Sequence, residues 1–392
     1  MTLERYVVLR TPTLRRPEFG TSAFELAAPA APEAVADLQI EAAEMTRREA
    51  GGLRRDPAVL SFAPVMPMKL HEPLEAEAGP EVQATWGVGA VGADTSPFDG
   101  RDVRVAVLDT GIDSSHPAFQ GLELVEKDFT GEGNGDKNGH GTHCAGTIFG
   151  RAIGGLRIGV APGVKSPLIG KVLDGNGRGS TEEIVRAIQW ALDEGANLVS
   201  MSLGMDFPGL IEALRASYPP EAATSLGLEA YRATVNLFSR LAAFARSRGE
   251  LFQATLIIAA SGNESDRPKY QVAVAPPAAA DDIQAVGALG EGANGLVVAR
   301  FSNTKPDVSA PGVAIQSARA GGGLKTLSGT SMATPHVVGV AALWADKLLR
   351  SQGGFGRDAL AAKLIASGTH EPLAPGFDPE DVGTGIVRAP QS

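Results

Sequence analysis

A serine set among small residues is the first group that could do chemistry. Ser331 stands in Gly329-Thr-Ser-Met-Ala-Thr-Pro-His336, at the start of an apolar run from Val337 to Leu349 that predicts a helix. The small neighbours leave its hydroxyl open to a substrate carbonyl. The first turn of a helix presents unpaired N–H groups and positive dipole charge, which stabilise an oxyanion. Ser331 is therefore the predicted nucleophile of an acyl transfer, and helix capping is the alternative interpretation.

A histidine between two glycines is the predicted general base. His140 lies in Asn138-Gly-His-Gly-Thr-His-Cys-Ala-Gly-Thr147, where the glycines leave the imidazole unobstructed. His140, His143 and Cys144 could instead hold a metal, but no other Cys/His cluster in the sequence supplies further ligands. We therefore assign no metal ligand. His143 and Cys144 are expected to be buried packing residues, and Cys144 is not preferred as the nucleophile.

Two more polar residues follow apolar stretches that predict buried strands. Asp109 comes directly after Val103–Leu108, and Asn263 comes shortly after Ala254–Ala260. The carboxyl ends of strands in open α/β sheets meet at one edge, where ligands bind. Either residue alone commonly forms a turn. Next to Ser331 and a histidine, however, Asp109 can orient the imidazole and the Asn263 amide can donate to an oxyanion.

The elements that must position these residues alternate between strand and helix from Asp102 onward. This alternation predicts an α/β fold with a mostly parallel sheet covered on both faces. A long helical insertion is expected at 205–253, with Pro219-Pro220 between two helices. The second helix has an apolar face that should pack against the sheet, formed by Tyr231, Val235, Phe238, Leu241 and Ala245.

The first 75 residues predict a separate, small α+β unit. A strand is expected at 5–10, a helix from Glu33 to about Glu49, and a strand at 57–64. Proline-bearing, acidic residues at 72–80 then mark a domain boundary. The predicted main domain is 76–392.

Composition excludes several classes of protein. The 392 residues carry a net charge of −10, which argues against a nucleic-acid partner, and a single cysteine excludes an intrachain disulfide. No apolar run is long enough to cross a bilayer, so no membrane partner is expected, and the N-terminus does not resemble a secretory signal. The glycine-rich loop 174–180 lacks the Lys-Ser/Thr ending of a phosphate-binding loop. A cytoplasmic protein is expected.

Asp109, His140, Asn263 and Ser331 together supply the groups that acyl transfer needs. The order Asp, His, Ser along the chain is that of the subtilisin type of triad. With the motifs at 107–113, 140–146, 202–204, 261–263 and 329–336, the chain resembles the subtilisin-like serine proteases over residues 85–390.

The resemblance implies a three-layer subtilisin-like α/β fold and a serine endopeptidase. Ser331 would attack the peptide carbonyl, His140 would transfer the proton, and Asp109 would orient the imidazole. Asn263 and the Ser331 N–H would form the oxyanion hole. The substrate would lie as an added strand between two edges, next to a third segment; these substrate-binding residues are Gly177, Arg178, Gly179, Ser202, Leu203, Gly204, Ala260, Ser261 and Gly262.

The resemblance also bears on cofactors. The family often has an aspartate calcium ligand after a His-Pro pair, but Ala118 follows His116-Pro117 here. The loop Arg151–Arg157, where further calcium ligands commonly lie, contains no Asn or Asp. No cofactor is therefore expected to be required, and the usual calcium ligands are missing.

Residues 1–75 are expected to be an inhibitory prosegment that the enzyme removes, because the family often carries such a unit. Met66–His71 would lie along the two edges like a substrate, with the cut between Met66 and Pro80. A permanent N-terminal domain is the alternative. The expected partners are a peptide substrate and this segment. Two other functions are considered: a peptide ligase or macrocyclase with the same triad, and a non-catalytic peptide-binding protein.

Overall fold

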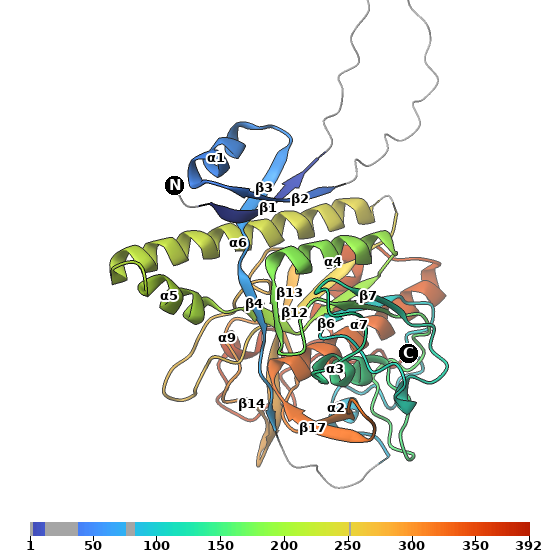
Figure 1. The fold of residues 1–392 in the computed structure, drawn as a ribbon. Helices are drawn as coiled ribbons and strands as arrows, with labels where there is room; N and C mark the ends of the chain where they lie inside the picture. Colours follow the sequence, from blue (N-terminus) through green and yellow to red (C-terminus); the bar gives the residue numbers. More distant parts are fainter. Residues whose placement is uncertain (1–2, 12–37, 76–82, 251) are drawn as a thin grey trace, which may run out of the picture.

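The computed structural model describes residues 3–11, 38–75, 83–250 and 252–392. A central sheet has the strand order β14-β13-β12-β10-β6-β8-β7, with β15 beside β13 (Figure 1). All of its pairs are parallel except β13 with β14. The predicted α/β fold with a mostly parallel sheet is confirmed. The strands are β6 (Val105–Asp109), β7 (Val125–Asp128), β8 (Leu168–Lys171), β10 (Leu198–Met201), β12 (Leu256–Ala260), β13 (Ile283–Gly292), β14 (Gly295–Val298) and β15 (Val308–Pro311).

Alternate side chains of each strand point to opposite faces of this sheet, so both faces carry a core. Val105 and Val107 of β6 pack with the helices of one face, and Ala106 and Leu108 pack with those of the other. Such doubly buried strands read as continuous apolar runs, which is why they were predictable. The first face is covered mainly by α3 (His140–Phe149) and α7 (Thr330–Gln352), the second by α4 (Thr181–Asp193) and α6 (Pro220–Gly249).

Smaller elements complete this body. The helices are α2 (Trp86–Ala90), α5 (Phe207–Arg215), α8 (Arg357–Ala366) and α9 (Pro379–Val382), with a 3₁₀ turn at Pro117–Phe119. The short strands β9 (Arg178–Ser180) and β11 (Leu203–Met205) flank the cleft, and β16 (Ile315–Ala318) pairs with β17 (Leu324–Ser328). No helix among the described residues is long and apolar enough to cross a membrane.

The predicted insertion forms α5 and α6. Phe238, Leu241 and Ala245 of α6 are buried against the sheet and α4, whereas Tyr231 and Val235 are half-buried. Helix α6 also packs on the N-terminal unit, which lies above it in Figure 1. The N-terminal unit therefore packs on the insertion.

The N-terminal unit is a sheet of order β2-β1-β3 with one short helix: β1 (Glu4–Arg10), β2 (Gln39–Met45), α1 (Arg47–Gly52), a 3₁₀ turn at Leu53–Arg55, and β3 (Val59–Pro64). The predicted helix from Glu33 to Glu49 is wrong. Residues 33–37 lie outside the described residues, and 39–45 form a strand paired with β1. Pairing with the apolar β1 outweighs the helix propensity of the Glu/Ala-rich sequence. The helix begins only after Thr46, whose side chain forms a capping box with Glu49.

Contacts of three kinds hold the N-terminal unit on α4 and α6. Arg5 makes a two-point ion pair with Glu182 of α4, with Nε–Oε2 at 2.7 Å and Nη2–Oε1 at 3.1 Å. Asn236 Nδ2 of α6 donates to Ser61 Oγ at 2.9 Å. Val7 and Leu9 of β1 join the apolar cluster of α4 and α6. The unit thus shares its core with the main body.

Two buried histidines are held neutral by the fold. His143 Nε2 donates to Ile315 O at 3.0 Å, and His336 Nδ1 donates to Met332 O at 2.8 Å. Burial lowers the pKa of His143 to about 3 and that of His336 to about 4. In the unfolded chain a histidine titrates near its ordinary value of 6.5, so the unfolded state binds these protons first.

We expect acid to destabilise the fold in steps that single variants can reveal. Between about pH 6 and 5 each of these histidines removes up to about 1.4 kcal/mol of unfolding free energy per pH unit, because mainly the unfolded state is protonated there. Urea unfolding of wild type and His143→Gln at both pH values measures this. The variant should lose about one such increment of pH dependence, whatever its stability at pH 7. Parallel curves for the two proteins would contradict a buried, neutral His143.

Candidate active site

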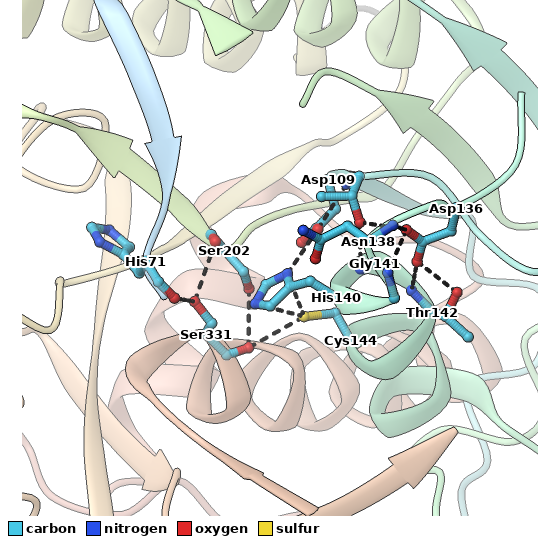
Figure 2. A network of polar contacts seen from close by, with 12 residues as sticks. His71, Asp109, Asp136, Asn138, His140, Gly141, Thr142, Cys144, Ser202 and Ser331 are labelled. Atoms are coloured by element: carbon cyan, nitrogen blue, oxygen red, sulfur yellow. Dashed lines mark hydrogen bonds and ion pairs between the residues drawn. The ribbon is translucent and has the colours of Figure 1, made fainter. Parts of the chain in front are cut away.

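Asp109 and His140 come from different elements and meet at the edge of the sheet. Asp109 ends β6, and His140 begins α3 after Gly139, whose φ of +97° favours glycine. His140 Nδ1 lies 2.8 Å from Asp109 Oδ1, which also accepts from Thr110 N at 2.7 Å (Figure 2). Burial alone would lower the pKa of His140, but the negative charge of Asp109 outweighs it and holds this pKa well above 6.5. The pair therefore stabilises an imidazolium.

Ser331 is the second residue of α7, where N–H groups lack intrahelical partners. Its hydroxyl oxygen lies 3.2 Å from Ser202 O and 3.4 Å from His71 O. Within the described part of the chain it makes no hydrogen bond to His140. In Figure 2 the His140 ring lies to one side of Ser331 and His71 to the other. The serine and the histidine are thus brought together while the hydroxyl is directed to other acceptors.

Asn263 follows the carboxyl end of β12 and lies next to the start of α7. Its Oδ1 accepts from Thr330 N at 2.9 Å and from Thr330 Oγ1 at 2.8 Å. These bonds direct Nδ2 into the cleft, where it donates to Glu72 O at 3.3 Å. Gly262 has a φ of +113°, and a Cβ there would lie 2.3 Å from Asn303 Nδ2. A glycine is required at that turn.

The two predicted edges enclose residues of the chain's own N-terminal part. The strand β4 (Pro67–Leu70) lies between β9 and β11, antiparallel to both. Lys69 pairs with Arg178 on one side and with Gly204 on the other, and Leu70 N donates to Gly177 O at 2.8 Å. After His71 and Glu72, which contact Ser331 and Asn263, β5 (Leu74–Glu75) pairs with β17. The described residues up to Glu75 thus cross the whole cleft.

Comparison with known proteins agrees with this geometry. The family model described as "Subtilase family" (Peptidase_S8) matches residues 100–367. The chain belongs to this family. The subtilase is similar to an "Intracellular serine protease" of Paenibacillus polymyxa, at 32% identity over 74% of this chain and 79% of that protein. It is also similar to the "Major intracellular serine protease" of Bacillus subtilis (34% identity over 62% and 68% of the two chains) and to a "Thermostable alkaline protease" of Halalkalibacterium halodurans (33% over 78% and 72%). It is a subtilisin-like serine endopeptidase.

The sequence did not reveal the role of Asp136 in this subtilase. Its carboxylate links the segment after Asp109 to the segment that carries His140. Its Oδ1 accepts from Thr110 Oγ1 at 2.9 Å and from Gly139 N at 2.7 Å. Its Oδ2 accepts from Thr142 N at 2.9 Å and Thr142 Oγ1 at 2.7 Å (Figure 2). The end of β6 and the start of α3 are therefore tied to one carboxylate. The sequence offered only one signal for it, an aspartate four residues before His140. Aspartate is common in turns and helix caps, so this signal is not specific.

Cys144 of the subtilase is fully buried beside His140 and Ser331, as expected. Its Sγ lies 3.7 Å from His140 Nδ1 and 3.4 Å from Ser331 O. Burial raises the pKa of the thiol, which disfavours the nucleophilic thiolate. The ligand atoms of Asp109, His140 and Cys144 lie within 4.8 Å of one another, a spacing that would suit a metal ion. Asp109, however, already engages Nδ1 of His140 at 2.8 Å.

Proposed function

We propose that the subtilase hydrolyses peptide bonds through an acyl-enzyme on Ser331. His140 Nε2 takes the Ser331 proton as Oγ attacks the carbonyl carbon, and later returns it to the leaving amine. Asp109 stays ionised and stabilises the imidazolium. Asn263 Nδ2 and the Ser331 N–H donate to the oxyanion. Water, activated by the same histidine, then releases the acid.

The observation that carries this proposal is the direction of three groups around one point. Ser331 Oγ and Asn263 Nδ2 both contact the backbone of His71 and Glu72. The His140 ring, held by Asp109, lies on the other side of Ser331 (Figure 2). Asn263 donates to Glu72 O, one residue after the His71 carbonyl that lies next to Ser331 Oγ, so the two groups reach adjacent carbonyls of that backbone. The arrangement supports attack on a carbonyl held in the cleft.

Asn263→Ala is expected to lower kcat roughly 10²–10³-fold with little change in KM, because an oxyanion donor acts mainly in the transition state. This magnitude is one established on subtilisin, and we carry it over to this relative. Steady-state hydrolysis of a chromogenic peptide measures it. Labelling of Ser331 by a fluorophosphonate, located by peptide mass, tests the nucleophile in the same preparation. A change confined to KM would reassign Asn263 to substrate binding.

We also propose that residues 1–75 are an inhibitory prosegment. Support comes from β4 and β5, which fill both sides of the cleft. His71, Glu72 and Pro73 cross the catalytic residues between these two paired stretches. The Ser331 hydroxyl there faces carbonyl oxygens instead of His140, which suits an inhibitor held without attack. The shielding that motivated the ligase alternative would then come from this segment and not from the insertion.

We propose that the enzyme needs no calcium. Ala118 and the ligand-poor 151–157 loop support this proposal. The buried ammonium group of Lys171 supports it as well. Lys171 is 2% exposed, and its Nζ lies 3.0 Å from Thr110 O, 3.4 Å from Gly135 O and 3.4 Å from Glu132 Oε2. Two carbonyl oxygens and a carboxylate oxygen around one centre resemble a metal-cation site. In this protein the ammonium group of Lys171 occupies that centre.

Chelators are therefore expected to leave the activity and Tm of the enzyme nearly unchanged, since no ion contributes to the folded state. Thermal unfolding with EDTA, and then with added calcium, measures this. Lys171→Met is the matched variant, and it should lower Tm because the oxygens around Nζ lose their cation. A large fall in Tm with EDTA that calcium reverses would show that other residues bind calcium.

We propose an intracellular location, since two relatives are named intracellular serine proteases. Cell fractionation with an antibody tests it, and recovery of the protein mainly from the culture medium would contradict it.

A further inference from the structure

One side chain of the cleft-bound segment fills a pocket beside the nucleophile. His71 is 2% exposed, and a Cβ added to Gly204 would lie 2.3 Å from His71 Cε1. The absence of a side chain at Gly204 therefore leaves the space that the imidazole occupies. The His71 carbonyl oxygen is 3.4 Å from Ser331 Oγ. This pocket thus receives the side chain of the residue whose carbonyl lies next to the nucleophile.

A carboxylate faces the ring inside this pocket. Glu264 Oε1 lies 3.4 Å from His71 Nδ1, an ion-pair distance. Among the described residues this buried nitrogen has no hydrogen-bond partner. The other carboxylate oxygen of Glu264 accepts from Asn303 Nδ2 at 2.7 Å, and Asn303 Oδ1 accepts from Glu264 N at 3.1 Å. Asn303 is fully buried, so the carboxylate is fixed in direction and not a freely rotating surface group.

With His71 in the pocket, the Glu264 carboxylate is ionised at neutral pH. Burial alone would raise the pKa of Glu264, but the close contact with His71 and the hydrogen bond from Asn303 outweigh it and lower this pKa to about 2. Three cations of this region form ion pairs with other carboxylates: Lys269 and Arg300 with Asp266, and Arg267 with Asp381. A partly buried anion costs free energy unless a cation or donor approaches it. The occupant of the pocket must supply that group.

We propose that Glu264 makes this pocket select a basic side chain, so that the preferred substrates carry Lys, Arg or His on the acyl side of the cleaved bond. This inference rests on the proposed function, because it names the substrate class of the same site. Glu264 is the specificity-determining residue, and Asn303 positions it. His71 is then the chain's own example of a preferred side chain, placed where a substrate's would be.

Pairs of peptides with one basic and one neutral side chain of similar shape test the proposal. The series Met-Lys-Leu-X copies residues 68–70, and X is lysine or norleucine in one pair and arginine or citrulline in the other. We expect kcat/KM to be at least about tenfold higher for the basic member in wild type. Both members are assayed in one preparation, so any occupancy of the cleft by residues 66–75 cancels in the ratio.

Two variants separate the pocket from its surroundings. Glu264→Gln should bring both ratios to near one, by lowering the rate for the basic member and raising that for the neutral one. Asp266→Asn removes a carboxylate two residues away that pairs with Lys269 and Arg300, and it should keep the wild-type ratios. Fluorophosphonate labelling of each variant shows that the site is folded.

Labelled wild type with equal rates for basic and neutral members would overturn the inference and leave the peptidase intact. The same conclusion follows if Glu264→Gln, though labelled, keeps the wild-type ratios. Wild type that neither labels nor cleaves any peptide would refute the proposed function, and the specificity with it.

Discussion

Ser331→Ala is expected to abolish peptide hydrolysis and fluorophosphonate labelling. Removing the nucleophile of such a triad lowers kcat on the order of 10⁶-fold, a magnitude established on subtilisin and carried over to this relative. The other hydroxyl at the start of α7, that of Thr330, is engaged by Asn263 Oδ1 at 2.8 Å. Single-turnover hydrolysis of a chromogenic peptide and labelling of the intact protein measure both effects.

Cys144→Ala is the matched control for this result. The thiol lies 3.7 Å from His140 Nδ1, but it is buried and its pKa is raised. We expect this variant to keep the label on Ser331. Full labelling of Ser331→Ala, whether on Cys144 or elsewhere, would remove Ser331 from the proposed mechanism.

The parts of the fold that sequence predicted are those whose patterns are local. Doubly buried strands such as Val105–Asp109 and Leu256–Ala260 are short apolar runs, and polar residues directly after them reach one edge of the sheet by geometry alone. The glycines around His140 and Ser331 were equally visible. The order of these motifs along the chain then indicated the family, which the comparisons confirm.

The parts that sequence did not predict depend on partners distant in the chain. Residues 39–45 are a strand because β1 needs an edge partner, and their own composition favours a helix. The proposed role of Glu264 follows from its contacts with His71, which is 193 positions earlier, and with Asn303. The insertion was predicted to be helical. That it packs against the N-terminal unit depends on contacts such as that of Asn236 with Ser61. Periodicity carries no information about such pairs.

Removal of the N-terminal segment by the enzyme's own activity is the second large effect that we expect. Purified wild type should lack residues before a cut between Met66 and Pro80, whereas Ser331→Ala should keep its full length. The reason is that residues 67–75 occupy both sides of the cleft, so an active enzyme must lose them to bind substrate. Intact mass and N-terminal sequencing of both proteins measure the difference.

A mixing experiment distinguishes the enzyme's own cut from that of a contaminating protease. A small amount of active wild type, added to tagged Ser331→Ala, should shorten the variant to the wild-type N-terminus. A fluorophosphonate-treated wild type should not, because its nucleophile is blocked. Since the segment's contacts include a buried His71 and a paired β4, we expect activity towards peptides to rise as the full-length band disappears. Full-length wild type with unchanging, full activity would show that residues 1–75 are a permanent domain.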